Sequence, residues 1–212
     1  PVNISRATTI AACYVALKHI FVDVPANGGV LEPVEFLIDP DSILSVEAPK
    51  PVSGYTETIL RLIDVAFQAI AQIAPKGAMA CSYGTINALS ITGHRPSGKR
   101  WVMFSFFGGG HGAYGGGDGL SHGNAPISTA TIPPLEVLEA AYPVRFTKWA
   151  LRSDSGGAGC WRGGLGGVYE IELLEKNAEV FLFGERGRFA PKGIVGGESG
   201  ALNRFHYQQG TT

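Results

Sequence analysis

The amino-acid sequence predicts an α+β fold in which N-terminal helices pack on a mostly antiparallel sheet, followed by a β-rich C-terminal part with glycine-rich loops. Two observations support this prediction. Helical periodicity dominates roughly the first third of the chain, and short runs of strand-forming residues dominate the rest. Helices early and strands late favour the α+β class over alternating βαβ units. We expect a segment 1–130 and a β-rich segment 131–212 that share one core.

The N-terminal third contains two predicted helices. From Ser5 to about Phe21, apolar residues recur at i, i+4, i+7 and i+11, with Ser5 as the cap and Pro25 as the stop. The apolar positions of this helix are Ile10, Tyr14, Leu17 and Phe21. A short strand, Val34–Ile38, is expected next. A second helix is expected over Thr56–Ala74, closed by the Pro75-Lys76-Gly77 turn. Its predicted buried side holds Ile59, Leu62, Ile63, Ala66, Ile70 and Ile73.

The remaining elements are mostly strands. Runs of strand formers lie between glycine- and proline-rich turns, and Pro96-Ser97-Gly98 is typical of a hairpin turn. The expected strands are Met79–Tyr83, Ile86–Thr92, Trp101–Phe107, Val144–Leu151, Gly167–Glu175 and Val180–Gly184. One short helix, Leu135–Ala141, follows Pro133-Pro134, with Thr131 as its expected cap.

Composition excludes several classes of protein. The formal net charge is -1 and no run of Lys or Arg occurs, which excludes the electrostatic pattern of nucleic-acid or anionic-membrane binding. The longest apolar stretches are shorter than the roughly 20 residues of a membrane span. Cys13, Cys81 and Cys160 form no C-x-x-C pair, which favours a reducing cytoplasm. Because the sequence begins at Pro1, we expect a processed or excised piece.

The loop Gly108–Gly119 follows a predicted strand and could present backbone N–H groups to an anion, with Gly109, Gly110 and Gly112 setting its shape. It is followed by no Gly-Lys-Ser/Thr, so ATP binding by this chain is disfavoured. His111, Asp118 and His122 have spacings that could allow two imidazoles and a carboxylate to meet a metal. The favoured alternative is an Asx turn at Asp118 with both histidines facing solvent or bonded to backbone.

The run from Leu151 to Gly166 is the most distinctive stretch of the chain. Arg152, Asp154 and Arg162 lie beside glycines, so the guanidinium groups and exposed N–H groups could clamp a carboxylate or a phosphate. Alternatively, Asp154 forms a structural ion pair with Arg152 or Arg162 that pins a glycine turn. The latter interpretation is favoured, and Asp118, Arg152, Asp154 and Arg162 are the candidate catalytic residues.

Three motifs follow one another in the second half of the chain: Pro134-Leu-Glu-Val-Leu-Glu139, Tyr142-Pro143 and Leu151-Arg-x-Asp-Ser-Gly-Gly-Ala-Gly-x-x-Arg-Gly-Gly-Leu-Gly166. In order, spacing and identity they resemble the C-terminal portion of the hydantoinase B/5-oxoprolinase family. Pro25-Ala-Asn-Gly-Gly29, Gly109-Gly-x-Gly-Ala113 before Asp118-Gly119, and Glu185-Arg186 through Gly197 extend the resemblance over nearly the whole chain.

The resemblance implies a two-part enzyme. An A-type subunit with an ATP site phosphorylates the amide or carbonyl oxygen, and the B-type part provides the site where a cyclic amide, hydantoin or 5-oxoproline, is opened. ATP is therefore expected on the partner, and this chain alone is expected to be inactive. The family's divalent-metal ligands belong to an N-terminal portion whose motifs this chain lacks, and Tyr114 stands where relatives often have Arg. An ATP-dependent ketone carboxylase of the acetone or acetophenone type and a non-catalytic assembly module remain alternatives.

Overall fold

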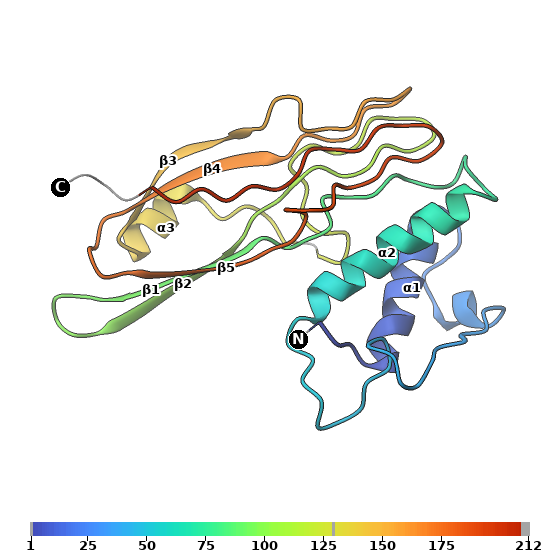
Figure 1. The fold of residues 1–212 in the computed structure, drawn as a ribbon, viewed down its shortest axis with the longest axis horizontal. Helices are drawn as coiled ribbons and strands as arrows, with labels where there is room; N and C mark the ends of the chain where they lie inside the picture. Colours follow the sequence, from blue (N-terminus) through green and yellow to red (C-terminus); the bar gives the residue numbers. More distant parts are fainter. Residues whose placement is uncertain (1, 129, 209–212) are drawn as a thin grey trace.

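The computed structural model describes residues 2–128 and 130–208, and it places three α-helices at the positions where helical periodicity predicts them. Figure 1 shows α1 and α2 side by side at one end of the molecule and the strands at the other. The elements are α1 (Arg6–Ile20), the 3-10 helix η1 (Gly28–Leu31), α2 (Tyr55–Ala71), β1 (Ala88–His94), β2 (Arg100–Phe106), α3 (Leu135–Ala141), β3 (Val144–Leu151), β4 (Gly167–Leu173) and β5 (Glu179–Phe183).

Helix α1 begins where the sequence predicts, because the Ser5 side chain accepts a hydrogen bond from the Thr8 backbone N–H at 3.3 Å. The predicted buried face is wrong. The buried residues of α1 are Thr9, Ala12 and Ala16, whereas Phe21 is half exposed beyond the helix end. Small side chains at these positions let α1 approach α2 closely, and this contact outweighs the larger apolar residues on the other faces.

Helix α2 supplies the large side chains of the helical layer. Ile63 and Phe67 are fully buried against α1. Ile73, predicted to be buried, is 84% exposed because the helix ends at Ala71. The predicted strand Val34–Ile38 is wrong, because this segment has no strand partner among the described residues and follows η1 in an irregular path.

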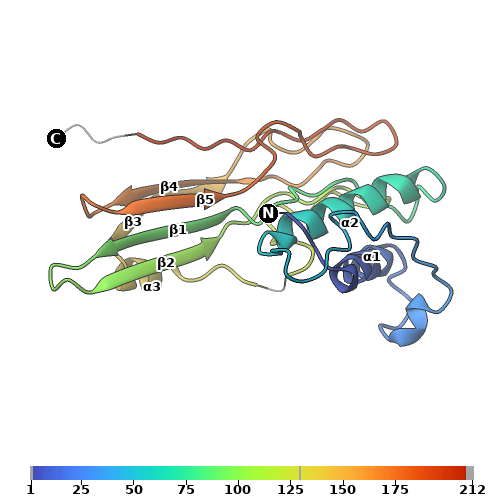
Figure 2. The same cartoon turned by 60° about the horizontal axis from the view of Figure 1, so that its bottom comes forward.

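The strands form two antiparallel sheets. The first has the order β2-β1-β5, and the second pairs β3 with β4. The predicted hairpin is confirmed, because β1 pairs with β2 from Ala88–Phe106 to His94–Arg100. Gly98, at φ 79°, occupies the turn position that favours glycine. Figure 2 shows β1, β2 and β5 as one layer, with β3 and α3 behind it.

Residues 79–83 form no strand, contrary to the prediction. Met79 makes only an isolated bridge with Tyr114, and the following N–H groups donate to three separate segments. Ala80 N donates to Ala113 O, Cys81 N to Lys192 O and Ser82 N to the Asp64 carboxylate. This segment, although its composition is typical of a strand, therefore bonds to two loops and to a side chain of α2.

The main core lies between the two sheets, and the α+β class is confirmed. Its fully or nearly buried members are Leu89, Ile91, Trp101, Met103, Phe107 and Val144. Helix α3 has the predicted bounds, but Thr131 does not cap it, since the N-cap position is Pro134 without a side-chain bond. The division at residue 130 stays a prediction. None of the described helices is long and apolar enough to cross a membrane.

Candidate functional site

The glycine-rich loops 108–123 and 156–167 are held together by backbone hydrogen bonds. Gly119 N donates to Arg162 O, and Gly164 N donates to His111 O, each at 2.8 Å. His122 N donates to Leu165 O at the same distance. Several N–H groups that the sequence suggested for anion binding are therefore already satisfied by carbonyl oxygens of the neighbouring loop.

The three glycines expected to shape the first loop lie where the backbone packs most tightly. A Cβ at Gly110 would collide with the Gly164 carbonyl oxygen, and one at Gly112 would collide with the Ala80 carbonyl oxygen. Gly109 N donates to Gly123 O at 2.9 Å, and the Tyr83 ring occupies the space of a Cβ at Gly109. These positions need glycine for close approach, and their contact with a substrate stays a prediction.

The candidate catalytic residues do not form one cluster in the way the sequence suggested. Asp118 Oδ1 accepts from the Arg162 backbone N–H at 2.7 Å, and Asp118 Oδ2 lies 3.8 Å from Arg162 Nε. The partner of Arg162 is thus Asp118 and not Asp154. Arg152 donates to the Leu202 carbonyl at 2.7 Å, and exposed Asp154 stands at φ 55° in the turn.

The two histidines of the first loop contact different neighbours. His111 Nε2 lies 2.5 Å from Asn124 O, and burial lowers the pKa of its imidazole. His122 Nε2 accepts from Trp149 Nε1 at 2.9 Å and lies 2.6 Å from the Tyr169 hydroxyl. Across the described residues, no group of three or more His, Cys, Asp or Glu side chains is arranged so that it could hold a metal ion. His111, Asp118 and His122 therefore do not form the metal site that their spacing allowed.

A second cluster, which sequence reasoning missed, joins α2 to residues 82–86 and 185–186. We call it the α2 charge cluster; its members are Glu57, Arg61, Asp64, Glu185 and Arg186. Asp64, whose side chain is only 4% exposed, accepts from Ser82 N at 3.1 Å and pairs with Arg186. Arg61 donates to the Gly84 carbonyl, and its Nε lies 3.5 Å from Glu185 Oε2.

Gly84 lies inside this cluster with φ at 60°, a conformation that favours glycine. A Cβ here would lie 2.7 Å from Arg61 Nη2 and 2.8 Å from both Arg186 Nη2 and Asp64 Oδ2. The absence of a side chain at Gly84 is thus what allows two guanidinium groups to reach the same carboxylate.

Glu57 is the most deeply buried acid of the cluster, at 1% exposure. One carboxylate oxygen accepts from Ile86 N at 3.1 Å, while Oε2 has no hydrogen-bond partner among the described residues. Burial raises the pKa of Glu57, the Ile86 N–H opposes this effect, and the charge of Glu185 adds to it. Burying an incompletely bonded carboxylate costs stability, so a role beyond packing would account for its presence.

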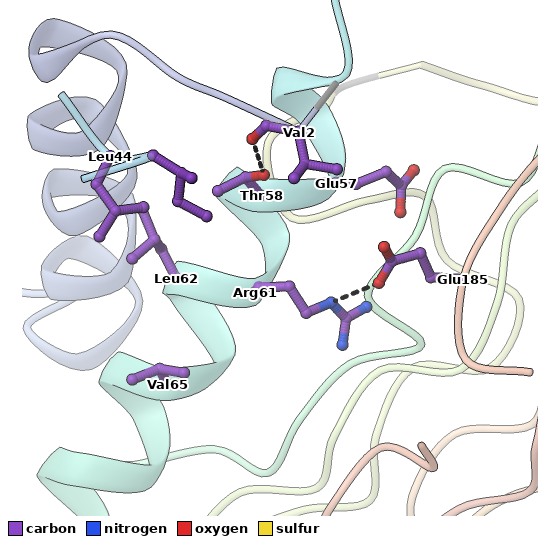
Figure 3. A pocket seen from close by; sticks show the side chains of 9 residues that line it. Val2, Leu44, Glu57, Thr58, Arg61, Leu62, Val65 and Glu185 are labelled. Carbon is purple, nitrogen blue, oxygen red and sulfur yellow. Dashed lines mark hydrogen bonds and ion pairs between the residues drawn. The ribbon is translucent and has the colours of Figure 1, made fainter. Parts of the chain in front are cut away.

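A pocket of about 240 Å³ opens beside the α2 charge cluster. Figure 3 shows Arg61 and Glu185 joined at one end, with Leu44, Leu62 and Val65 around the helix side. The lining consists of Val2, Ile43, Leu44, Glu57, Thr58, Arg61, Leu62, Val65 and Glu185. This arrangement can hold a small molecule that has an apolar body and a polar edge.

Comparison with known proteins identifies the family. The family model described as Hydantoinase B/oxoprolinase matches residues 1–212. The chain belongs to this family. The 5-oxoprolinase 1 of Arabidopsis thaliana is 35% identical over 200 residues, which cover 93% of this chain and 15% of that protein. Caprolactamase subunit beta of Pseudomonas jessenii is 32% identical over 213 residues, with coverage of 95% and 36%.

Two solved structures show the same fold. A structure of the ATP-dependent caprolactamase from Pseudomonas jessenii aligns with a TM-score of 0.74 at 26% identity, over 90% of this chain and 34% of that one. A nucleotide-free acetone carboxylase aligns with a TM-score of 0.80 at 19% identity, over 95% and 28%, a likeness of fold alone. This hydantoinase B-type chain thus spans about a third or less of the proteins it matches.

The α2 charge cluster could have been inferred from spacing. Glu57, Arg61 and Asp64 recur at i, i+4 and i+7 on a helix, so one face of α2 carries charges in register. Ionisable residues next to the apolar stripe of an amphipathic helix indicate a buried ion pair or a site. The partner residues, Glu185 and Arg186, could be recognised only as part of the family resemblance.

The buried pair predicts a large stability difference between two arginine variants. Arg186→Gln leaves the Asp64 carboxylate buried without its closest partner, so we expect a loss of about 3–5 kcal/mol in the free energy of unfolding. Arg162→Gln breaks an ion pair whose side chains are half exposed and should cost no more than about 1 kcal/mol. Denaturant unfolding of both variants measures this difference, and equal losses would contradict it.

Glu57 predicts a pH dependence of stability. Burial raises the pKa of Glu57 in the folded protein, so the folded state binds this proton more tightly than the unfolded state does. The free energy of unfolding therefore falls as the pH rises from about 4, the pKa of Glu in the unfolded chain, through the folded pKa. Glu57→Gln keeps an acceptor for Ile86 N and removes this loss. We expect the melting temperature of the variant, relative to the wild type, to increase between acidic and neutral pH. The exposed control Glu136→Gln should show no such trend, and a pH-independent difference for Glu57→Gln would be evidence against the assignment.

Proposed function

We propose that this chain is part of the B-type subunit of an ATP-dependent cyclic-amide hydrolase that opens hydantoin or 5-oxoproline rings. The observation that supports this most directly is the family match over residues 1–212. It is reinforced by relatives more than 30% identical whose names, 5-oxoprolinase and caprolactamase subunit beta, refer to lactam substrates. Cyclic amides are therefore the substrate class that the relatives favour.

The proposed chemistry divides the work between two polypeptides. An ATP-binding A-type subunit transfers a phosphoryl group from ATP to the amide oxygen, which leaves ADP and makes the carbonyl carbon electrophilic. Water then attacks that carbon, and the C–N bond of the ring breaks as the nitrogen takes up a proton, which leaves an acyl phosphate. A second water hydrolyses the acyl phosphate to the carboxylate and inorganic phosphate. The sequence of this chain has no Gly-Lys-Ser/Thr phosphate loop, which is why ATP is assigned to the partner.

In this scheme the chain contributes the surroundings of the ring. We infer that the pocket beside α2 holds the methylene groups of the lactam against Leu44, Leu62 and Val65. Arg61 and Glu185, which are partly exposed, would face the polar amide edge. The loop residues Asp118, Arg152, Asp154 and Arg162, with Gly109, Gly110 and Gly112, remain proposed site residues, and the isolated chain is proposed to be inactive.

A ketone carboxylase is the alternative function, because the chain shares its fold with an acetone carboxylase. The two functions differ in the second substrate. In a complex reconstituted with an ATP-binding partner and the N-terminal remainder of a B-type subunit, we expect ATP-dependent hydrolysis of 5-oxoproline or hydantoin without bicarbonate consumption. Arg162→Ala should reduce turnover or complex formation, because it removes the guanidinium that pairs with Asp118 between the two glycine loops. Bicarbonate-dependent ATP use with a ketone, and no ring opening, would establish the carboxylase instead.

The pocket assignment has its own test. Val65 is 61% exposed, so Val65→Trp can fill the pocket without disturbing the core. We expect this change to lower kcat/KM for the cyclic amide at least tenfold, chiefly through KM, because the ring loses its place. Val137→Trp on α3 is the matched control, since Val137 is 60% exposed and remote from the pocket lining. Equal kinetics for the two variants would remove the pocket from the site.

The assembly-module alternative makes a different prediction from the same complex. If this chain only docks other subunits, pocket-filling variants would leave turnover unchanged while surface variants impair assembly. Both the pocket beside α2 and a large exposed apolar sheet face are present, so docking and substrate contact are compatible in one chain.

A further inference from the structure

The outer face of the β2-β1-β5 sheet is apolar and uncovered. The register aligns Ala88 of β1 with Phe106 on one side and Phe183 on the other. One row further along, Ser90 is flanked by Phe104 and Phe181 in the same way. We call this surface the phenylalanine face; it consists of Phe104, Phe106, Phe181 and Phe183 around Ala88 and Ser90.

These four rings are not needed for the core. The alternate residues, such as Ile91 and Met103, point to the opposite face and pack between the two sheets. The phenylalanines are between 43% and 58% exposed. In Figure 2 the sheet lies in front of β3 and α3, and no described helix or strand crosses its near face. Four adjacent exposed phenyl rings are unusual on a monomer and mark an interaction surface.

The solvent-accessible area of the chain is larger than that expected for a monomeric protein of its mass. The chain exposes 12887 Å². A monomeric protein of 22.3 kDa is expected to expose about 9,400 Å². The excess of about 3,500 Å² is some four times the ~800 Å² that one partner contributes to a standard interface. A second copy bound through this sheet alone would leave most of that excess in water. The part of a B-type relative that this chain does not match is larger than this chain, so it can cover the phenylalanine face with one helix and other exposed surface with its remainder.

We propose that the phenylalanine face is covered by a helix of the polypeptide that B-type relatives have in addition to the segment matched here. The caprolactamase beta subunit has enough additional polypeptide for such a helix, since this chain covers only 36% of it. The dimensions agree, because the outer strands of three lie about 9.6 Å apart and a helix with its side chains is about 10–12 Å wide. The occupant would carry an aliphatic stripe, with spacing i, i+4 and i+7, along β1.

The proposal is independent of the enzymatic reaction, and its test uses no turnover measurement. We would replace the matched segment of the caprolactamase beta subunit with this full chain and compare that chimera with the isolated chain. Hydroxyl-radical footprinting read by mass spectrometry reports the reactivity of each phenylalanine side chain. We expect all four rings to be reactive in the isolated chain and at least tenfold protected in the chimera.

Variants check that the face itself holds the two parts together. With this chain and the remainder of the beta subunit expressed as separate polypeptides, Phe104→Ser with Phe181→Ser should weaken their association at least tenfold. Phe189→Ser, at a site 72% exposed and outside the sheet, is the matched control and should have a much smaller effect. Melting curves of the isolated variants show whether each still folds.

Three outcomes would overturn the proposal. Rings that stay equally reactive in the chimera would show that the family's remaining polypeptide does not cover them. A dimer of the isolated chain, dispersed by the double serine change, would assign the face to a second copy. Association of the two separate polypeptides that the double serine change leaves intact would show that the face does not hold them together, whether or not the chimera folds. Loss of ring opening in a reconstituted complex, with protection intact, would count against the proposed function alone.

Discussion

The pairing of Asp64 on α2 with Arg186 near the end of the chain is the contact on which the arrangement of the two layers depends. The helical layer and the sheets have separate apolar clusters, one around Phe67 and one around Met103. What connects them is largely polar: carboxylates of α2 accept the backbone N–H groups of Ser82 and Ile86. Backbone N–H groups of segment 82–86 thus donate to side chains of a helix, whereas in a sheet they would donate to the carbonyl groups of a neighbouring strand.

Such a junction is costly to build and specific once built. A buried carboxylate requires its guanidinium and its N–H donors together, because the loss of any one leaves a charge desolvated without compensation. Gly84 shows how little room there is, since both arginines and Asp64 surround the space where its side chain would be. Three members of the α2 charge cluster, Glu57, Arg61 and Glu185, also line the pocket and give it its charged end. The ligand contact that we propose at Arg61 and Glu185 would therefore be coupled to stability.

The sequence was informative at several places where a local rule determines structure, although the local rule that made Thr131 the cap of α3 failed. The Ser5 cap, the hairpin around Gly98 and the bounds of α3 depend on neighbouring residues only, and each is confirmed. Predictions failed where distant packing decides. The buried face of α1 is formed by small residues that suit α2, and residues 79–83 donate to segments far away in sequence. The α2 charge cluster was missed for the same reason, because Arg186 lies 122 residues from Asp64.

The glycine loops show why the candidate residues within them were harder to interpret than their motif. A glycine-rich run leaves open whether its N–H groups face a ligand or another loop. Here the N–H groups of Gly119 and Gly164 donate to carbonyl oxygens of the other loop. Asp118 bonds both the backbone and the side chain of Arg162, so it fastens the two loops at one point. A rigid double loop of this kind can position a substrate without contacting it. The distinction matters for the reaction: a loop that only positions should alter KM and kcat through geometry, whereas a loop that binds phosphate should respond to the charge of Arg162 itself.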